Sequence, residues 1–289
     1  MSSGPQISAF FDEATNSVSY LVADPASRAA AVIDPVLDFD LAGGIVSTQS
    51  ADRILAAAEE QGLSVAWVIE THVHADHLSA AAHIRDRTGA KVGIGVGVRE
   101  VQGVFAPIFG ADDVPGSDDF DRLFEDGETI QLGELTIEVM ATPGHTPACI
   151  SYKIGDAAFV GDTLFMPDYG TARTDFPGGD AGQLYRSIQR IFALPPETRL
   201  FLCHDYKAPG RSEYAWQTTV GEEAERNVHI GGGASAEAFI EMRHSRDATL
   251  CAPKLLYPAI QVNIRGGRLP PAEADGSRFL KIPVEIADR

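Results

Sequence analysis

The sequence predicts a layered α/β sandwich in one compact domain, followed by a short C-terminal extension. Short apolar segments of strand length alternate with segments whose apolar residues recur at helical spacing. The two halves of the chain repeat this layout, and such a mixture suits sheets covered by helices. We assign residues 1–244 to the domain. Residues 245–289, rich in Pro, Gly and Arg, are assigned to an extension that packs on it.

The first half of the chain is expected to contain five strands and two helices. The strands are expected at 7–11, 18–23, 29–34, 64–70 and 91–96. The helices are expected at 51–61 and 77–88. Ser50 is the expected N-cap of the first helix, and Gly62 and Gly89 are the expected stops.

The second half repeats this style, with turn signals between its segments. Its strands are expected at 128–132, 135–141, 149–154, 157–161 and 199–203. Helices are expected at 181–193, 219–228 and 235–243. The turn at Gly155-Asp156 pairs two of the strands, and Pro195-Pro196 ends the first helix.

Composition and charge narrow the possible environments and partners. No apolar run of about 18 residues exists, and the first residues lack a secretory pattern. The three cysteines indicate no disulfide framework, which favours a reducing, cytoplasmic location. The net charge of −18 opposes binding to nucleic acid and to anionic membranes. A homodimer is expected from the frequency of such assemblies among soluble enzymes.

A cluster of possible metal ligands follows the strand expected at 64–70. The segment contains His72, His74, Asp76 and His77 within six residues. In an extended loop His72 and His74 point the same way, because side chains alternate with a period of two. Imidazole and carboxylate are the groups that hold Zn, Fe and Mn. The segment therefore predicts a metal site rather than four unrelated surface residues.

Three more candidates lie where other strands end. His145 follows strand 135–141, Asp162 follows strand 157–161, and His204 follows strand 199–203. In α/β sheets the carboxyl edge of the strands is where sites form, so we expect these side chains to join the first cluster. Cys203, next to His204, is interpreted as an ordinary buried strand residue rather than a redox-active one.

These residues and their order resemble the metallo-β-lactamase superfamily. The segment THVHADH at 71–77 is similar to its THxHxDH signature, and His145, Asp162 and His204 match the later motifs in order. The resemblance covers about residues 7 to 210. It implies a four-layer αβ/βα sandwich with a metal site at one edge of two packed sheets.

Three further segments resemble persulfide dioxygenases within that superfamily. Residues 170–176 (GTARTDF) are similar to their GxxRTDF stretch, and residues 204–206 are similar to their HDY motif. Residues 258–265 (PAIQVNIR) resemble the short tail of these enzymes and of bacterial β-lactamase-like hydrolases linked to sulfide response. The helical C-terminal substrate domain usual in glyoxalase II enzymes is not recognised.

The resemblance implies one Fe(II) held by His72, His145 and Asp162, which leaves three coordination positions open. The implied reaction converts glutathione persulfide, dioxygen and water to glutathione and sulfite. Iron supplies the one-electron steps that dioxygen requires, whereas zinc has no redox chemistry.

An alternative reaction stays open, because the chain carries every ligand of a two-metal site. His74, Asp76, His77 and His204 either support the iron ligands by hydrogen bonds or bind a second metal, with Asp162 as the bridge. In the second case two Zn²⁺ would hydrolyse a glutathione thioester, as in glyoxalase II. A non-enzymatic role as a sulfide-responsive binding partner is a third hypothesis.

The same resemblance implies residues that bind the substrate. Tyr206 and Arg226 match positions that hold glutathione in the resembling enzymes, and Arg173 is a further candidate. Because glutathione carries carboxylates, a cationic site is expected. Each arginine has an ordinary alternative: Arg173 in an ion pair with Asp175, and Arg226 on a solvated helix face.

Overall fold

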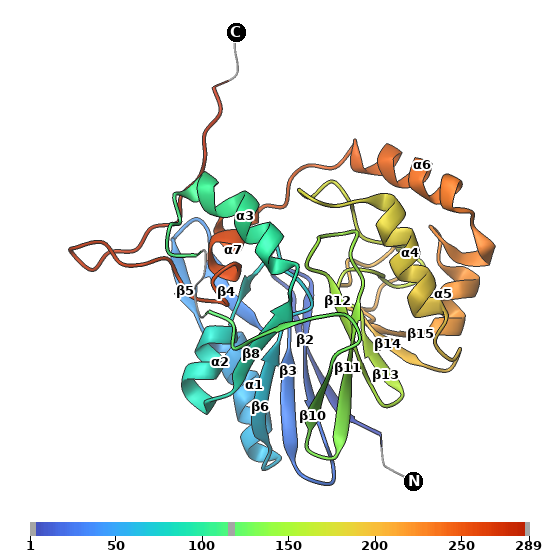
Figure 1. Cartoon of the computed structure of the whole chain (residues 1–289), viewed down its shortest axis with the longest axis horizontal. Helices are drawn as coiled ribbons and strands as arrows, with labels where there is room; N and C mark the ends of the chain where they lie inside the picture. Colours follow the sequence, from blue (N-terminus) through green and yellow to red (C-terminus); the bar gives the residue numbers. More distant parts are fainter. Residues whose placement is uncertain (1–3, 115–118, 287–289) are drawn as a thin grey trace.

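Two six-stranded sheets lie face to face at the centre of the molecule (Figure 1). The computed structural model describes residues 4–114 and 119–286. The strand order is β1-β2-β3-β6-β8-β9 in the first sheet and β10-β11-β12-β13-β14-β15 in the second. The layered α/β sandwich predicted from the sequence is therefore confirmed.

The first sheet is built from the first half of the chain. Its strands are β1 (Gln6–Asp12), β2 (Ser17–Ala23), β3 (Ala29–Ile33), β6 (Ser64–Ile69), β8 (Lys91–Gly95) and β9 (Arg122–Phe124). β1 and β2 form a hairpin whose turn holds Asn16 at φ 57°, a conformation that asparagine adopts more readily than most residues. β3, β6, β8 and β9 run parallel, so their carboxyl ends meet at one edge.

The second sheet is built from the second half. Its strands are β10 (Thr129–Leu132), β11 (Leu135–Ala141), β12 (Ile150–Ile154), β13 (Ala157–Phe159), β14 (Arg199–Phe201) and β15 (Gln217–Thr219). The only parallel pair among these strands is β13 with β14. A small third sheet of β5 (Ile45–Ser47), β4 (Val36–Asp40) and β7 (Leu78–Ser79) lies beside the first.

Helices cover the outer face of each sheet. The helices are α1 (Gln49–Glu60), α2 (Ala81–Thr88), α3 (Val98–Phe109), α4 (Ala181–Phe192), α5 (Val220–Arg226), the 3-10 helix η1 (Gly231–Gly233), α6 (Ala236–Asp247) and α7 (Leu256–Asn263). α1 and α2 pack on the first sheet through Ile54 and Ile84, and α4 packs on the second through Leu184 and Ile188. Helix, sheet, sheet and helix are the four layers expected from the resemblance.

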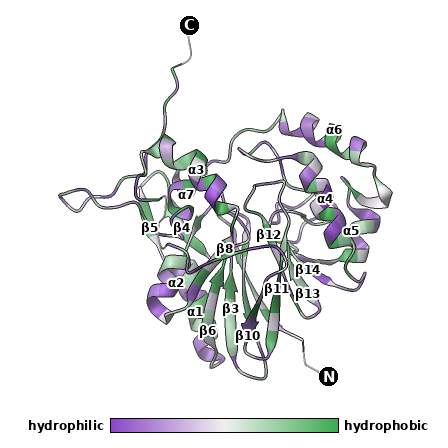
Figure 2. Ribbon diagram, in the orientation of Figure 1, coloured by the Kyte–Doolittle hydropathy of each residue, from purple (hydrophilic) through white to green (hydrophobic). Residues whose placement is uncertain are grey.

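An apolar layer lies between the two sheets. Residues of both sheets share one buried cluster, among them Ile33, Ile69, Ile137, Tyr152 and Phe159. Figure 2 shows the same division, with hydrophobic strands inside and hydrophilic residues frequent on the outer helices. Burial of apolar surface between the two sheets, and between each sheet and its helices, fixes the position of the sheets relative to each other. It thereby fixes the edge at which the strands end.

The C-terminal extension is continuous with the domain. The boundary assigned at 244/245 falls inside α6, which packs on the second sheet through Phe239. α7 belongs to the opposite side, where Ala259 and Val262 are buried with the first-sheet cluster. The segment between the two helices therefore crosses from one half of the sandwich to the other (Figure 1).

Two local expectations are wrong. The helix expected to begin at 77 begins at Ala81, because Leu78-Ser79 pairs with β4 as β7. α1 begins at Gln49 rather than after Ser50. Its N-cap is Thr48, which makes no side-chain capping bond. The sequence patterns also missed β4, β5, α3, β9 and α7, most of which are short or lie in irregular segments.

No helix in residues 4–114 and 119–286 is long and apolar enough to cross a membrane.

A buried carboxyl group on α5 makes stability depend on pH. Glu223 is fully buried, and its Oε1 has no hydrogen-bond partner among the described residues, while Asn227 Nδ2 donates to Oε2 over 2.6 Å. Burial, with repulsion from Glu222 and Asp168, raises the pKa of Glu223 to about 8. Between the unfolded pKa of about 4.3 and pH 8, the folded state keeps a proton that the unfolded state releases. Stability from this group therefore falls as the pH rises through that window.

Glu223→Gln is expected to remove this dependence, because the amide stays neutral and keeps an acceptor for Asn227. At pH 8 the variant should exceed the original protein in free energy of unfolding by roughly 2–4 kcal/mol, and at pH 4 the difference should nearly vanish. Urea denaturation at both pH values measures it. The exposed Glu225→Gln is the control. An equal difference at both pH values would contradict the prediction.

Candidate metal centre and adjoining cavity

Seven side chains from the carboxyl edges of both sheets meet at one place. They are hereafter the metal-site residues: His72, His74, Asp76, His77, His145, Asp162 and His204. The first four lie in the loop after β6, and the others follow β11, β13 and β14. The parallel pairing of β13 with β14 delivers Asp162 and His204 side by side. Strand ends that are far apart in the sequence therefore meet at one place, as the position of the candidate ligands after the strands predicted.

Asp162 occupies the middle of the group. Its Oδ2 lies 3.8 Å from His72 Nε2 and 3.6 Å from His145 Nε2. Its Oδ1 lies on the other side, 3.4 Å from His204 Nε2, which is in turn 3.2 Å from Asp76 Oδ2. Each carboxylate oxygen thus faces a different set of donors. This arrangement suits one cation beside Oδ2, and a second beside Oδ1.

Each histidine of the group uses one ring nitrogen in a hydrogen bond and turns the other toward the site. The Nδ1 atoms of His77, His145 and His204 donate to the carbonyl oxygens of Leu78 (3.1 Å), Arg173 (2.8 Å) and Asn16 (3.2 Å), respectively. These bonds hold the rings in one orientation and leave Nε2 as the atom that faces the site. Such outer hydrogen bonds are usual behind metal-binding histidines.

The free atoms are buried without partners in the described part of the chain. These atoms are Nε2 of His72, His77 and His204, Nδ1 of His74, Oδ2 of Asp76 and Oδ1 of Asp162. A buried polar atom without a hydrogen-bond partner is destabilising. Of the six, His204 Nε2 forms ion pairs with Asp76 Oδ2 and Asp162 Oδ1, at 3.2 and 3.4 Å, and the group as a whole favours a bound cation. Imidazole nitrogen and carboxylate oxygen are the ligands of zinc, iron and manganese. The residues present therefore fit a metal centre.

Asp34 orients two of the histidines from behind. His74 Nε2 lies 3.1 Å from Asp34 Oδ1 and 3.2 Å from Glu70 Oε2. His72 Nδ1 lies 3.0 Å from Thr71 Oγ1, which donates to Asp34 Oδ2 over 2.8 Å. One buried carboxylate therefore supports both rings. Asp34 was missed in the sequence, although it directly follows β3 at the same edge as the ligands.

The C-terminal extension holds the ligand loop in place. Asn263, the last residue of α7, donates from Nδ2 to the carbonyl oxygens of His74 and His77, each over 2.8 Å. Its Oδ1 accepts from the backbone nitrogen of Ser79 over 2.7 Å. These three bonds hold the bend at His77 and the strand β7 that follows it, where the sequence predicted the start of a helix. The sequence singled out the segment 258–265 as a resemblance but gave Asn263 within it no role.

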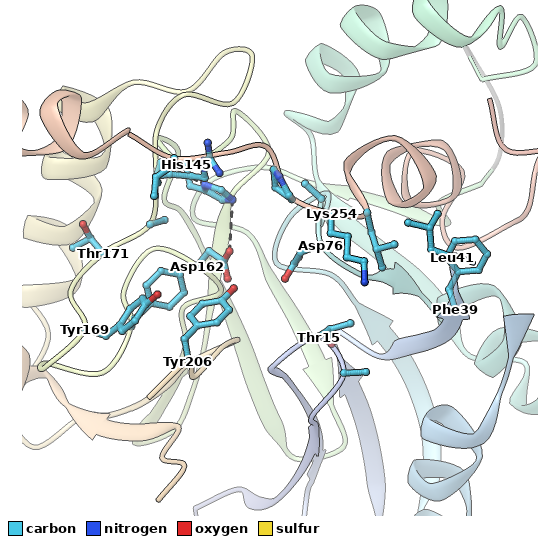
Figure 3. Close-up of a pocket in the computed structure, with 18 of the residues that line it drawn as sticks. Thr15, Phe39, Leu41, Asp76, His145, Asp162, Tyr169, Thr171, Tyr206 and Lys254 are labelled. Atoms are coloured by element: carbon cyan, nitrogen blue, oxygen red, sulfur yellow. Dashed lines mark hydrogen bonds and ion pairs between the residues drawn. The ribbon is translucent and has the colours of Figure 1, made fainter. Parts of the chain in front are cut away.

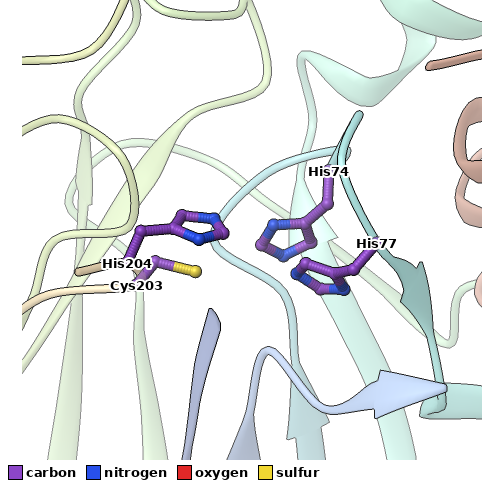
Figure 4. A group of neighbouring side chains, drawn as sticks. All are labelled: His74, His77, Cys203 and His204. Atoms are coloured by element: carbon purple, nitrogen blue, oxygen red, sulfur yellow. The ribbon is translucent and has the colours of Figure 1, made fainter. Parts of the chain in front are cut away.

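Cys203 is closer to the site than expected. Figure 4 shows its sulfur beside the rings of His74, His77 and His204, and one ligand atom from each of the four lies within 4.8 Å of the others. The residue is buried, as predicted, and burial raises the pKa of its thiol. The neutral thiol therefore contributes packing against the histidines.

The protonation of the histidines matches their surroundings. Burial, aided by repulsion from neighbouring histidines, lowers the pKa of His72 well below its usual value and that of His77 to about 3. Both rings are neutral at pH 7 and can bind a metal. Burial also lowers the pKa of His204, but the carboxylates of Asp76 and Asp162 outweigh it and raise the pKa well above its usual value. A metal cation would displace that proton.

A cavity of about 680 Å³ opens beside the metal-site residues (Figure 3). Asp76, His145 and Asp162 are the members of the group that line it, so one side of the centre is open to a ligand. The volume is in the range of small-molecule sites. The four other members are fully or almost fully buried behind this wall.

Aromatic side chains form the wall next to the centre. The Tyr206 ring stacks on His204, with centroids 5.4 Å apart and 9° between planes, and it contacts Phe165 and Tyr169 edge-on or tilted. Burial and the nearby carboxylates of Asp76 and Asp162 raise the pKa of Tyr206 well above its usual value. The phenol is therefore neutral at pH 7 and can donate a hydrogen bond to a ligand in the cavity (Figure 3).

The two predicted arginines lie in different places. Arg173 lines the cavity, but its Nε and Nη2 each donate to Asp175 over 2.6 Å, and Nη1 donates to the Cys251 carbonyl over 2.7 Å. Arg226 does not line the cavity. It lies on α5, where its exposed side chain is 3.6 Å from Glu222. Arg173 is therefore in an ion pair with Asp175, and Arg226 is on a solvated helix face.

Comparison with known proteins gives several similar chains. A probable metallo-hydrolase of Burkholderia pseudomallei is 51% identical over 96% of this chain and 99% of its own length. A beta-lactamase hydrolase-like protein of Agrobacterium fabrum is 50% identical, and this chain spans 66% of its length. The human persulfide dioxygenase ETHE1 is 31% identical over 89% of this chain and 87% of its own.

A solved structure and a family profile agree with the fold. The crystal structure of ETHE1 from Myxococcus xanthus superimposes with a TM-score of 0.74 at 35% identity, covering 91% of this chain and 100% of the other. The profile described as Metallo-beta-lactamase superfamily matches residues 13–204, a range that contains every metal-site residue. The chain thus belongs to the metallo-beta-lactamase superfamily, as a metal-dependent enzyme.

Proposed function

We propose that the protein is a persulfide dioxygenase that oxidises glutathione persulfide at a mononuclear Fe(II) site. The observation that carries the proposal is the group of His72, His145 and Asp162, whose ligand atoms lie within 4.8 Å of one another beside the cavity. Two histidines and one carboxylate form the ligand set of many non-haem iron oxygenases, with positions left for both reactants. Similarity to the human and Myxococcus xanthus proteins supports the same assignment.

The proposed reaction converts glutathione persulfide, dioxygen and water to glutathione, sulfite and two protons. The bond between the two sulfur atoms breaks, and the outer sulfur gains three bonds to oxygen. Four electrons pass from that sulfur to dioxygen, whose two atoms end in sulfite with one oxygen from water. Iron, when bound, supplies the one-electron chemistry that dioxygen requires, which zinc lacks.

The residues of this chain position the substrate and control its surroundings. The persulfide enters the cavity with its sulfur toward His145 and Asp162, the exposed edge of the metal group. Tyr206 is held by stacking on His204 and donates a hydrogen bond to the charge that develops there. Phe165 and Tyr169 exclude water from the same wall.

A second candidate is a two-metal hydrolase of glutathione thioesters. The observation that favours it is the geometry of Asp162, whose two oxygens face separate sets of donors. With the six unpartnered atoms of the group, the chain can ligate two cations. Two metals would generate hydroxide and polarise a thioester carbonyl. The name of the similar Burkholderia pseudomallei protein, a probable metallo-hydrolase, agrees with this candidate.

Oxygen consumption separates the two candidates. Protein loaded anaerobically with Fe(II) should take up dioxygen when glutathione persulfide is added, with one sulfite formed per dioxygen consumed. The same protein loaded with Zn²⁺ should show no uptake and little hydrolysis of S-lactoylglutathione. No uptake with iron confirmed in the sample, together with rapid thioester hydrolysis by the zinc form, would replace the first proposal with the second.

A further inference from the structure

The C-terminal extension contributes to the lining of the cavity. Arg246, near the end of α6, lines it together with four residues of the segment 248–255 between α6 and α7: Leu250, Pro253, Lys254 and Leu255. In Figure 3 the side chain of Lys254 points into the cavity, across from Tyr169 and Tyr206. A ligand whose sulfur reached the metal-site residues would therefore have its remaining atoms within reach of this segment.

Two of the four cations that line the cavity are already neutralised. Arg173 is paired with Asp175. The buried Arg243 donates from Nε to Asp247 over 3.1 Å and forms an ion pair with it at 2.9 Å. Arg246 and Lys254 differ, because neither side chain has a hydrogen bond or ion pair with any residue in the described ranges. Their charges are free, although the chain as a whole carries a net charge of −18. Two free cations in the lining of one cavity, Arg246 on the side of Tyr169 and Lys254 across from it, favour an anionic ligand against that general field.

We propose that Arg246 and Lys254 form an anion subsite that binds the carboxylates of a thiol peptide. This inference rests on the proposed function, which places the sulfur of the ligand at the metal-site residues. It adds that Arg246 and Lys254 bind the peptide part of the same ligand. A guanidinium can bind a carboxylate through two parallel hydrogen bonds, and an ammonium adds a point charge. The subsite makes the enzyme selective for persulfides of carboxylate-bearing peptides over those of small neutral thiols. Arg226, by contrast, lies outside the cavity.

Binding of S-methylglutathione to the metal-loaded full chain tests the subsite by calorimetry. The blocked sulfur prevents turnover, so the measurement does not depend on the reaction. Arg246→Ala and Lys254→Ala are each expected to weaken binding roughly 5–10-fold, and the double variant about 50-fold. Arg186→Ala is the matched control, because Arg186 is an exposed helix arginine without an ion pair in the described structure and outside the cavity. It should bind as the original protein does.

The dimethyl ester of S-methylglutathione is the second ligand in the binding experiment. It lacks both negative charges, so it should bind more weakly than the acid, and the two substitutions should have no further effect on it. Equal binding of acid and ester, unchanged binding by the double variant, or no binding of the acid would overturn the subsite. Failure of oxygen uptake with this binding pattern intact would refute only the dioxygenase reaction. Uptake with acid and ester bound equally would refute only the subsite.

Discussion

Replacement of Asp162 with alanine is expected to remove most of the bound metal and with it the activity. Both carboxylate oxygens face histidine nitrogens, at 3.4 to 3.8 Å, so the substitution removes a ligand from whichever metal is present. Loss of a partner behind a ligand typically lowers metal affinity about 10–100-fold, and loss of the ligand itself should exceed that. Metal content after gel filtration, measured by mass spectrometry, and the initial rate report the effect.

Asp156→Ala is the control for this experiment. Asp156 lies in the turn between β12 and β13, at the opposite end of the strand that leads to Asp162, and pairs with Arg199 at 2.9 Å. The control should keep both metal and activity. Unchanged metal content in the Asp162 variant would show that this carboxylate is not a ligand, and would refute the proposed centre under both candidate functions.

Replacement of His204 with alanine is expected to separate one metal from two. In the proposed mononuclear site His204 does not bind the iron. It stacks on Tyr206 and approaches the carboxylates of Asp76 and Asp162, at 3.2 and 3.4 Å. The variant should then keep about one iron per chain and lose about 10–100-fold in rate, as for other residues that support a centre. His145→Ala, which removes a ligand, should lose the iron.

The number of metal ions per chain in each variant decides between one metal and two. If the original protein holds two metals and the His204 variant holds one or none, His204 is a ligand and the two-metal hydrolase is favoured. Equal iron content in the His204 and His145 variants would instead contradict the assignment of the iron to His72, His145 and Asp162. Both variants should be compared at the same pH, because metals displace protons from these rings.

The local spacing of apolar and polar residues was enough to predict the site's location. Four strands that end at the common edge, β6, β11, β13 and β14, show an apolar run followed within a few residues by His or Asp, as at 135–145 and 157–162. This pattern can be recognised in a short stretch of sequence, because a buried strand shows itself as a run of consecutive apolar residues. It predicted the metal-site residues as candidates, and Asp34 could have been added on the same signal after β3.

Features that depend on distant parts of the chain could not be predicted this way. The helix predicted from 77 to 88 included His77, but His77 lies in a bend before β7, held by the pairing of β7 with β4 and by the bonds from Asn263. His77 and Asn263 are far apart in the sequence, so no periodic pattern of residues indicates that they are in contact. The same holds for Cys203, whose position beside His74 follows from the packing of the two sheets.

The sequence by itself determined the fold class, the superfamily resemblance and the residues that meet at the strand ends, because these depend on short-range patterns and on a specific motif. Only the tertiary structure decided how Asp162 faces two sets of donors, which cations remain free in the cavity and that Arg226 lies outside it. Those properties depend on packing between the sheets and on where the C-terminal extension crosses the cavity. Long-range contacts of this kind are set by burial across the whole domain, which no local pattern encodes.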